Sequence, residues 1–387
     1  MRNRVCFILD WYPTPDNSGC IFAKNLIYAM ADRGVECTVI APRMVHPNVL
    51  RQKVAYHRVE ETDTGAQINI YMPWYVHCSS KENLMSLSMD NHYRAVLKTI
   101  RRHHLTFDVI YGHFIYQCGL TAARIGNRLK IPAYCACGES SGRLKERSLP
   151  YSIGFASAGW KAILDKLTGM ICVSTYNKEL LLQNGFINSD KKIAVFPNGV
   201  DERRFHKMDQ KALRKQLGFP EDAFIVAFTG TFSERKGFFR LCDALKKCEN
   251  VYSIFLGKGD HTPDCDNVLY CGSVPNQEVS RYLNAADVFV LPTNGEGCCN
   301  AIVEALACGL PVISSNQSFN DDILNDSNAI RIDVENVNEI RDAINLLKND
   351  CGRRSEMARA AEHDGRELKL ANRAEKIMQF MEIDYAL

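Results

Sequence analysis

Residues 287–311 read DVFVLPTNGEGCCNAIVEALACGLP, and this stretch decides the fold class of the chain. The apolar run 288–291 predicts a buried strand, the polar glycine-containing residues after it predict a loop, and the apolar run after the loop predicts a short helix. Asn300 is expected to be the N-cap of that helix, and Gly309 and Pro311 are expected to end it. Strand, loop and helix in this order are typical of a parallel α/β sheet.

Short runs rich in Val, Ile and Phe recur along the whole chain and alternate with helical patterns, which predicts βα units in both halves. These runs are Val5–Leu9, Cys37–Ala41, Ile68–Met72, Asp108–Tyr111, Ala133–Cys137, Met170–Val173 and Ile193–Phe196 in the first half, and Phe224–Thr229, Val251–Leu256, Val268–Cys271, Val288–Leu291 and Pro311–Ser314 in the second. A length of 387 residues is enough for two domains of this kind. The fold class is therefore expected to be α/β, with two doubly wound, Rossmann-like domains.

The domain boundary is expected near Pro197–Asp201, where turn residues end the first series of strands. The expected domains are residues 1–200 and 201–372, and the last helix, residues 373–387, is expected to cross back to the first domain. Ligands of open parallel sheets bind outside the carboxyl ends of the strands. The cleft between two such sheets facing each other is therefore the expected active site.

The composition argues against a disordered, collagen-like or low-complexity chain. With 46% hydrophobic and 24% charged residues the chain can form ordinary cores, and no apolar run reaches the ~18 residues of a membrane-spanning helix. Met1–Asp10 lacks the pattern of a signal peptide, so a cytoplasmic protein is expected.

Residues 1–200 carry 24 Lys and Arg against 15 Asp and Glu, and the remainder carries 23 against 30. No basic repeat with interleaved aromatic residues indicates a nucleic-acid partner.

The sixteen cysteines are expected to be thiols in a reducing cytosol. The pairs Cys135/Cys137 and Cys298/Cys299 lack the two-residue spacers of common zinc motifs, so core packing is favoured over metal binding there and no metal site is expected.

Charged residues at strand ends indicate the chemistry of the second domain. Arg235 and Lys236 follow a glycine turn after a buried strand, so they can neutralise a diphosphate leaving group. Glu296 and Glu304 lie beside the start of the short helix, where they can accept hydrogen bonds from a sugar and a ribose. Each group also has an alternative interpretation without a ligand. Arg235 and Lys236 could form a solvated basic turn and Glu296 could be a solvated loop residue. Glu304 could be a helix-start carboxylate that the helix dipole favours.

The Glu-x7-Glu spacing of Glu296 and Glu304 in a strand, loop and helix resembles the signature of glycosyltransferase family 4, whose members are retaining GT-B enzymes that use nucleotide-activated sugars. The resemblance covers nearly the whole chain. Its other segments are Tyr12–Gly34, Asp108–Pro132, Val173–Asp201 and the phosphate-binding loop Gly230–Gly237.

The resemblance implies a role for each domain. The first domain is expected to bind the acceptor and the second the nucleotide sugar, with Gly272-Ser273-Val274 near the base. The implied donor-binding residues are Ser18, Gly19, Gly230, Arg235, Lys236, Val274, Glu296, Gly297, Cys298, Cys299, Asn300 and Glu304, and the implied catalytic residues are Glu296, His113 and Lys236. The implied partners are a nucleotide sugar and a glycan or lipid-linked glycan acceptor in cell-surface polysaccharide synthesis, with no metal required.

The chain departs from the family pattern at three places. Many members carry Arg directly after the first glycine of the phosphate loop, where this chain has Thr231, so Arg235 is expected to replace it. Ser18-Gly19 stands where members have a Gly-Gly pair. His113 matches the family's Asp-Val-Ile-x-x-His pattern, but a second histidine usual after the next strand is missing, and Glu139 is expected to take part of its role.

Other functions remain open from the sequence. Gly138–Gly142 fits the G-x-S-x-G pattern of a serine hydrolase, with Ser140 as the nucleophile. An epimerase or phosphorylase-like GT-B enzyme, or a sugar-nucleotide binding protein without activity, would share the same fold. Asp264 and Asp266 match a metal-binding Asp-x-Asp but are expected to lie in a solvated turn. No dinucleotide fingerprint or P-loop is present.

Basic residues of the first half predict peripheral contact with the inner face of a membrane. They are Arg94, Lys98, Arg101 and Arg102 at helical spacing, and Arg143, Lys145 and Arg147 before the apolar stretch Tyr151–Trp160. Basic residues beside exposed apolar ones favour an anionic lipid surface. The alternative is a solvated basic face.

Overall fold

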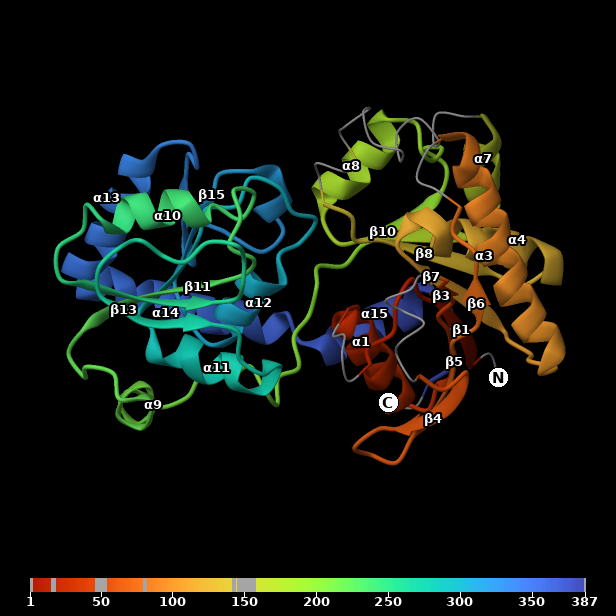
Figure 1. The fold of residues 1–387 in the computed structure, drawn as a ribbon, viewed down its shortest axis with the longest axis horizontal. Coiled ribbons are helices and arrows are strands. Elements are labelled where there is room, and N and C mark those ends of the chain that lie inside the picture. Colours follow the sequence, from red (N-terminus) through yellow and green to blue (C-terminus); the bar gives the residue numbers. More distant parts are fainter. Residues whose placement is uncertain are drawn as a thin grey trace. The chain divides into compact units, whose positions relative to one another are not determined.

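The computed structural model describes residues 3–14, 19–45, 54–78, 82–140, 144 and 158–385. The chain forms two compact units. Unit 1 comprises Met1–Phe196 and Arg373–Leu387, and unit 2 comprises Pro197–Asn372. Each unit is built around a predominantly parallel sheet with helices on its faces (Figure 1).

Unit 1 contains an eight-stranded sheet and a separate pair of two-residue strands. Its strands are β1 Arg4–Ile8, β2 Glu36–Ile40, β3 Arg43–Met44, β4 His57–Glu61, β5 Gln67–Tyr71, β6 Trp74–Tyr75, β7 Val109–His113, β8 Ala133–Cys137, β9 Gly169–Cys172 and β10 Lys192–Val195. Its helices are α1 Ile21–Ala31, α3 Glu82–Arg102, the π-type turn η1 Ile115–Gly119, α4 Leu120–Leu129, α7 Ala158–Leu164, α8 Thr175–Gln183 and, from Arg373 on, α15 Leu370–Phe380.

The strand order of the large sheet is β10-β9-β8-β7-β1-β2-β5-β4, and all neighbours are parallel except β4 and β5. The chain runs outward from β1 through β2 to β5, and then outward in the other direction from β7 to β10. The sheet therefore has a topological switch point between β1 and β7, where ligands of doubly wound sheets bind.

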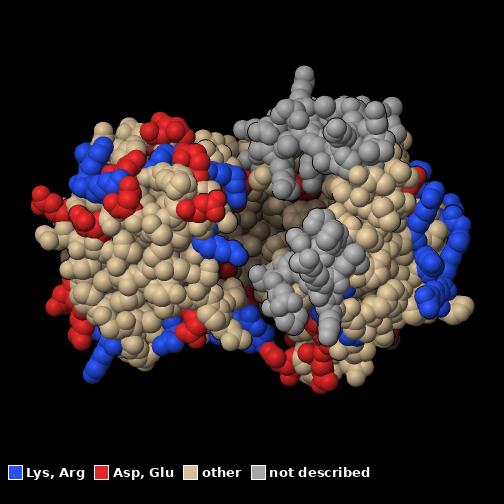
Figure 2. Space-filling view, in the orientation of Figure 1, with Lys and Arg blue, Asp and Glu red and all other residues tan. Residues whose placement is uncertain are grey.

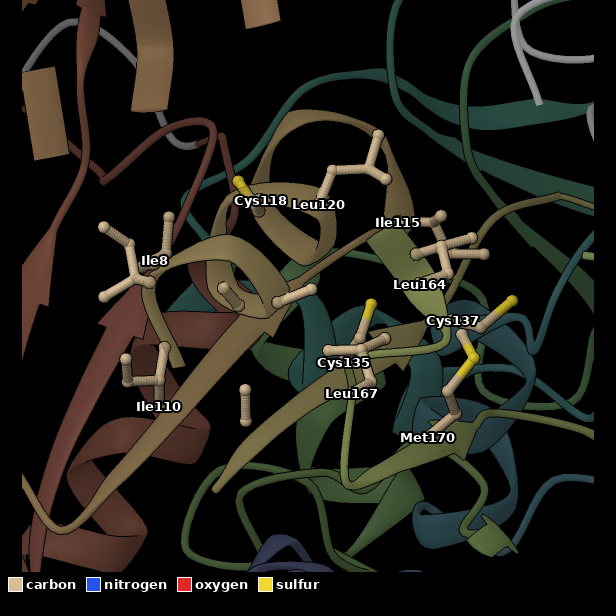
Figure 3. Close-up of a cluster of buried hydrophobic side chains, with 14 of the residues drawn as sticks. Ile8, Ile110, Ile115, Cys118, Leu120, Cys135, Cys137, Leu164, Leu167 and Met170 are labelled. Atoms are coloured by element: carbon tan, nitrogen blue, oxygen red, sulfur yellow. The ribbon is translucent and has the colours of Figure 1, made fainter. Parts of the chain in front are cut away.

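The main core of unit 1 lies between the sheet and helices α3, α4, α7 and α8. Fully buried side chains from β1, β7, β8 and β9 meet Leu120 at the start of α4 and Leu164 at the end of α7 (Figure 3). Continuous apolar strands are typical of parallel sheets that are covered on both faces. Helices α1 and α15 lie on the opposite face (Figure 1).

Unit 2 contains a six-stranded parallel sheet. Its strands are β11 Phe224–Thr229, β12 Val251–Leu256, β13 Val268–Gly272, β14 Val288–Leu291, β15 Val312–Ser315 and β16 Ala329–Ile332. Its helices are α9 Gln210–Leu217, α10 Phe238–Leu245, α11 Asn276–Ala285, α12 Asn300–Ala307, the 3₁₀ turn η2 Ser318–Asn320, α13 Val337–Asn349 and α14 Cys351–Glu367.

The strand order of unit 2 is β13-β12-β11-β14-β15-β16, which places the switch point between β11 and β14. Helices α10 and α13 pack together on one face of this sheet, and α12 and α14 pack together on the other. The loops that follow β11 and β14 are therefore the expected ligand-binding loops of unit 2.

The last helix is fastened to unit 1. The ring of Phe380 lies 5.7 Å from that of Tyr134 on β8 and 6.1 Å from that of Phe196. Lys192 Nζ donates to the Phe380 carbonyl at 3.0 Å, and Arg373 Nε donates to the carbonyl of Phe196 at 3.4 Å.

The predicted α/β class with two doubly wound sheets is confirmed, and each of the twelve predicted apolar runs forms a strand. Four strands were not predicted. β4 has the polar sequence HRVEE, because it is an antiparallel edge strand with alternate residues exposed. β3 and β6 are too short to carry a pattern, and Arg331 interrupts the apolar run of β16.

Candidate active site

The loops after β11, β12 and β14 pack closely at the switch point of unit 2. A Cβ atom on Gly257 would lie 1.8 Å from the carbonyl oxygen of Gly230, and one on Gly237 would lie 2.1 Å from that of Pro292. Both glycines have positive φ angles, 152° and 73°, that side chains disfavour. Only glycine can therefore bring the phosphate-loop candidate Gly230–Gly237 against the end of β14.

This packing brings Arg235 and Lys236 against Glu296, which follows Arg235 by 61 residues in the chain. Arg235 Nη1 and Lys236 Nζ lie 2.8 and 2.7 Å from the same oxygen of Glu296, Oε1. Thr293 Oγ1 donates to that oxygen at 2.8 Å and to the carbonyl of Arg235 at 3.1 Å. No described residue donates to Oε2, so one carboxylate oxygen of this cluster is left for a ligand.

The two cations differ in exposure. The side chain of Arg235 is 48% exposed, whereas those of Lys236 and Glu296 are 13% and 11% exposed. Burial disfavours the charge of Lys236, but Cys299 and Glu296 outweigh it and raise the pKa of Lys236. Burial also raises the pKa of the Cys299 thiol, which is therefore neutral at pH 7, so Glu296 is the anion that keeps Lys236 charged.

Glu304 lies in the second turn of α12 and is half-buried. Desolvation raises the pKa of its carboxyl to about 8, although the positive charge of Lys236 opposes the shift. No described residue donates a hydrogen bond to this carboxyl. A carboxyl desolvated without a donor is a candidate acceptor for ligand hydroxyls.

The start of α12 differs from the prediction, because the N-cap is Cys299 and Asn300 is the first helical residue. The side-chain oxygen of Asn300, Oδ1, accepts a hydrogen bond of 2.8 Å from Asn198 Nδ2. The same Nδ2 donates to the carbonyl of Cys298 at 3.0 Å. Asn198 thus fixes the loop before α12. Sequence reasoning missed this role, although it noted Asn198 as part of the turn at the domain boundary.

The remaining donor-site candidates of unit 2 lie at the same edge of the sheet. Gly297 and Cys298 are buried in the loop after β14. Val274 is half-buried between β13 and α11. The end of β13 is joined to the loop after β12, because Gly257 N donates to Gly272 O at 2.9 Å and Ser273 Oγ donates to Gly257 O at 3.2 Å.

In unit 1, His113 is the last residue of β7 and is 4% exposed. Its Nδ1 lies 3.3 Å from the Tyr111 hydroxyl, and its ring contacts those of Phe22 and Phe114 at 5.2 and 4.7 Å between centroids. Burial, with a smaller contribution from Arg373, lowers the pKa of His113 to about 3. His113 is therefore neutral at physiological pH.

The loop after β1 ends at Gly19, which precedes α1, and Ser18 lies outside the described residues. Glu60 of β4 holds the two ends of this segment together. Its Oε2 accepts hydrogen bonds of 2.9 and 2.8 Å from the hydroxyls of Tyr12 and Tyr28, and it pairs with Lys24 at 2.8 Å.

Two motifs suggested other functions in the sequence: the serine-hydrolase pattern Gly138–Gly142 and the Asp-x-Asp pattern of Asp264 and Asp266. Glu139 is buried, and its Oε1 accepts a 2.6 Å hydrogen bond from the backbone N–H of Ile115. Ser140 makes no side-chain hydrogen bond to a His or a carboxylate in the described part of the chain, which disfavours a hydrolase triad. Asp264 and Asp266 are exposed, and Asp264 pairs with Lys246 at 2.6 Å.

Family models match both halves of the chain. The model described as Glycosyltransferase Family 4 matches residues 21–204, and that described as Glycosyl transferases group 1 matches residues 209–364.

Relatives whose names state an activity are distant in sequence. The putative teichuronic acid biosynthesis glycosyltransferase TuaC of Bacillus subtilis (strain 168) is 28% identical over 81% of each chain. The UDP-Gal:alpha-D-GlcNAc-diphosphoundecaprenol alpha-1,3-galactosyltransferase of Escherichia coli is 26% identical over 47% of this chain and 52% of its own.

Solved structures resemble the whole chain. Sucrose-phosphate synthase from Thermosynechococcus elongatus matches with a TM-score of 0.75 and 17% identity over 98% of both chains. Anabaena HepE in complex with UDP-glucose matches with a TM-score of 0.69 and 16% identity over 98% of this chain and 99% of its own. Two family models that together span most of the chain show that it belongs to glycosyltransferase family 4 and is a glycosyltransferase, and the structural likeness over its full length shows the GT-B fold.

Proposed function

We propose that the protein moves a hexose from a nucleotide-diphosphate donor to a glycan or lipid-linked glycan acceptor in cell-surface polysaccharide synthesis, with retention of anomeric configuration. The observation that carries this proposal is the cluster of Arg235, Lys236 and Glu296 at the switch point of unit 2. It offers two cations for a diphosphate and one carboxylate for a sugar, side by side.

The donor diphosphate binds Arg235 and Lys236 in competition with Glu296 Oε1. Arg235 is half-exposed, so it can turn toward a phosphate at little cost. Lys236 stays near Gly230, since a Cβ atom on Gly230 would lie 3.6 Å from Lys236 Cδ. Glu304 accepts hydrogen bonds from the ribose hydroxyls, and Glu296 Oε2 accepts from a hydroxyl of the sugar. The backbone from Gly297 to Asn300 and the residue Val274 line the donor.

In the chemical step the acceptor oxygen bonds to the anomeric carbon on the face from which the diphosphate departs. The bond from that carbon to the phosphate oxygen breaks, and the departing phosphate takes the acceptor proton. Arg235 and Lys236 neutralise the charge that develops on the leaving group, so no metal is needed at the diphosphate. His113, with a pKa of about 3, contacts the acceptor bound by unit 1 as a neutral hydrogen-bonding group rather than as a proton carrier.

The names of relatives support the acceptor class. They include a putative teichuronic acid biosynthesis enzyme and a galactosyltransferase whose name gives a diphosphoundecaprenol-linked sugar as acceptor.

Helix α3 supports a membrane contact of unit 1. Arg94, Lys98, Arg101 and Arg102 are all exposed on it, and Figure 2 shows Lys and Arg gathered at the right-hand edge, over this helix. Leu87 on α3 and Val76 after β6 are 44% and 55% exposed. Trp160 belongs to the apolar stretch that was expected to lie exposed beside the second basic group, but it is buried. The residues of that group, Arg143, Lys145 and Arg147, lie outside the described residues. No helix in the described part of the chain is long and apolar enough to cross a bilayer.

Sedimentation with vesicles tests this contact. The protein is expected to pellet with anionic but not with neutral vesicles and to be released by high salt, at about 1 kcal/mol per basic residue. Replacing the four α3 residues with Gln should abolish pelleting, whereas replacing Lys211, Lys215, Arg353 and Arg359 of unit 2 should not. No pelleting of the parent protein at low salt contradicts a membrane contact.

Transfer itself is tested with a panel of nucleotide diphosphates and their sugars. A donor should raise the melting temperature, and the stabilisation should grow with the logarithm of its concentration over its dissociation constant. The stabilising donor should then give a labelled product with lipid-linked glycans prepared from bacterial membranes. Product analysis with donor alone separates the alternatives, because conversion without an acceptor indicates an epimerase, and binding with no product across acceptors indicates a binding protein.

A further inference from the structure

A second cluster of reactive side chains lies at the switch point of unit 1. Asp10 follows β1, His92 lies on α3, and Cys118 lies in η1 after β7. One ligand atom from each of these residues lies within 4.8 Å of the others, and no other group of this kind is found among the described residues. Cys118 Sγ donates to Asp10 Oδ1 at 3.0 Å.

In the described part of the chain, only one of the two ring nitrogens of His92 has a hydrogen-bond partner. His92 is 0% exposed, its Nδ1 lies 2.8 Å from the Thr121 hydroxyl, and its Nε2 has no hydrogen-bond partner among the described residues. A buried polar nitrogen without a partner costs about 1–3 kcal/mol, and native proteins rarely leave one. Thr121 occupies Nδ1 and fixes the ring, which leaves Nε2 for a ligand. An outer hydrogen bond of this kind orients histidines that bind metals.

The turn that carries Cys118 is rigid and strained. Phe114 and Gln117 have φ angles of 72° and 55°, in the region that residues other than glycine disfavour. A Cβ on Gly112 of β7 would lie 2.6 Å from the carbonyl oxygen of Cys118, so the turn packs directly on the strand. Figure 3 shows the sulfur of Cys118 pointing away from those of Cys135 and Cys137. Strain of this kind persists where the surrounding structure holds a functional group in place.

We propose that Asp10, His92 Nε2 and Cys118 Sγ bind one zinc ion, with water as the fourth ligand. Carboxylate, imidazole and thiolate together are a donor set typical of Zn²⁺. Zinc bonds of about 2.0–2.3 Å at tetrahedral angles place ligand atoms about 3.3–3.6 Å apart. A pair of ligand atoms at the limit of 4.8 Å therefore closes by about 1 Å when the ion enters, whereas Cys118 Sγ and Asp10 Oδ1, at 3.0 Å, move slightly apart. The S–Zn bond replaces the S–H bond of Cys118, and the proton leaves to solvent.

By binding one residue from each, this ion connects the loop after β1 with α3 and η1. It therefore fixes the carboxyl-end edge of the sheet, where the loop toward Gly19 begins. It is separate from the diphosphate cations of unit 2 and does not depend on the proposed transfer reaction. It differs from the sequence prediction that the chain binds no metal. That prediction rested on cysteine pairs that lack the two-residue spacers of zinc motifs, whereas these ligands are separated by 82 and 26 residues.

Metal analysis and cobalt spectroscopy of the full chain test the proposal. Protein produced with added zinc, with any affinity tag removed, is expected to carry about one zinc per chain. Metal-free protein titrated with Co²⁺ is expected to show thiolate-to-cobalt charge transfer in the near ultraviolet. Cys118→Ser should lose this band, and Asp10→Asn should weaken zinc binding at least about tenfold. The control Cys37→Ser removes another buried thiol, one that donates to the Ile27 carbonyl, and should leave both readouts unchanged.

Near-ultraviolet circular dichroism checks the fold of each variant. Asp10 is partly exposed and Asn has nearly the same shape, so Asp10→Asn remains decisive if Cys118→Ser does not fold. The proposal is overturned if the parent protein binds no zinc and shows no charge-transfer band. It is equally overturned if Asp10→Asn binds zinc as tightly as the parent, since the ion then lies elsewhere.

Discussion

Replacing Glu296 with Gln should change donor binding and transfer in opposite directions. In the free protein the carboxylate of Glu296 neutralises both Arg235 and Lys236 through one oxygen. The amide of Gln keeps the shape and an acceptor oxygen but removes the negative charge. The cations are then freer for a diphosphate, while the sugar loses a charged partner.

The magnitude of each effect follows from the geometry. A carboxylate about 7 Å from a phosphate charge repels it by about 2 kcal/mol at an effective dielectric constant of about 20. Arg235 is half-exposed, so solvent screening reduces this to about 1 kcal/mol and predicts about fivefold tighter binding of the nucleoside diphosphate. Transfer loses a charged hydrogen bond to the sugar and the attraction for positive charge on its ring. These are worth about 2–3 kcal/mol together, or a 30- to 150-fold slower rate.

Calorimetry with the nucleoside diphosphate and an assay of product formation measure the two effects on one protein sample. Glu362→Gln is the matched control, because Glu362 on α14 also pairs with an Arg, Arg366, but lies outside the cluster. Circular dichroism should be the same for all three proteins. A transfer rate within twofold of the parent, or diphosphate binding weakened tenfold, would refute the assignment of Glu296.

Three further outcomes are expected. Arg235→Ala with Lys236→Ala should weaken binding of the nucleoside diphosphate about a hundredfold and that of the bare nucleoside less than twofold; an equal loss measured by calorimetry for both ligands would place the phosphates elsewhere. The pKa of Glu304 is raised to about 8 in the folded protein and is about 4.3 when unfolded, so its stability contribution is lost as the pH rises toward 8. Glu304→Gln should therefore gain melting temperature relative to the parent between pH 5 and pH 8, and a constant difference would contradict this. Transfer without added Mg²⁺ or Mn²⁺ should stay within twofold of the rate with them, whereas activity that requires Mn²⁺ would reverse the proposed role of the cations.

The fold could be predicted from the sequence because parallel strands buried on both faces are continuous apolar runs. Twelve such runs were sufficient to indicate two doubly wound sheets. The pattern fails where a strand is exposed on one side, as in β4, whose residues alternate between half-buried and exposed. It also fails for β3 and β6, since two residues cannot display a period.

The donor-site candidates could be found because charged residues directly after buried strands stand out against their surroundings. Arg235, Lys236 and Glu296 satisfy that rule, and they lie in one cluster. The residues that position them could not be found in this way. Thr293 and Asn198 act through hydrogen bonds to partners that are defined only by the packing of loops. The predicted N-cap was wrong by one residue, since Cys299 is the N-cap and Asn300 is already helical.

The topology explains why both clusters lie where they do. At a switch point the two central strands send their chains to opposite sides, so their carboxyl-end loops diverge and leave backbone and side chains facing a common space. In unit 2 these are the loops after β11 and β14, which carry Arg235 and Glu296. In unit 1 they are the loops after β1 and β7, which carry Asp10 and Cys118, and α3 adds His92. Strand order, which depends on pairings far apart in sequence, therefore selects which polar residues meet, and a local motif can identify them only when a whole cluster falls within one or two loops.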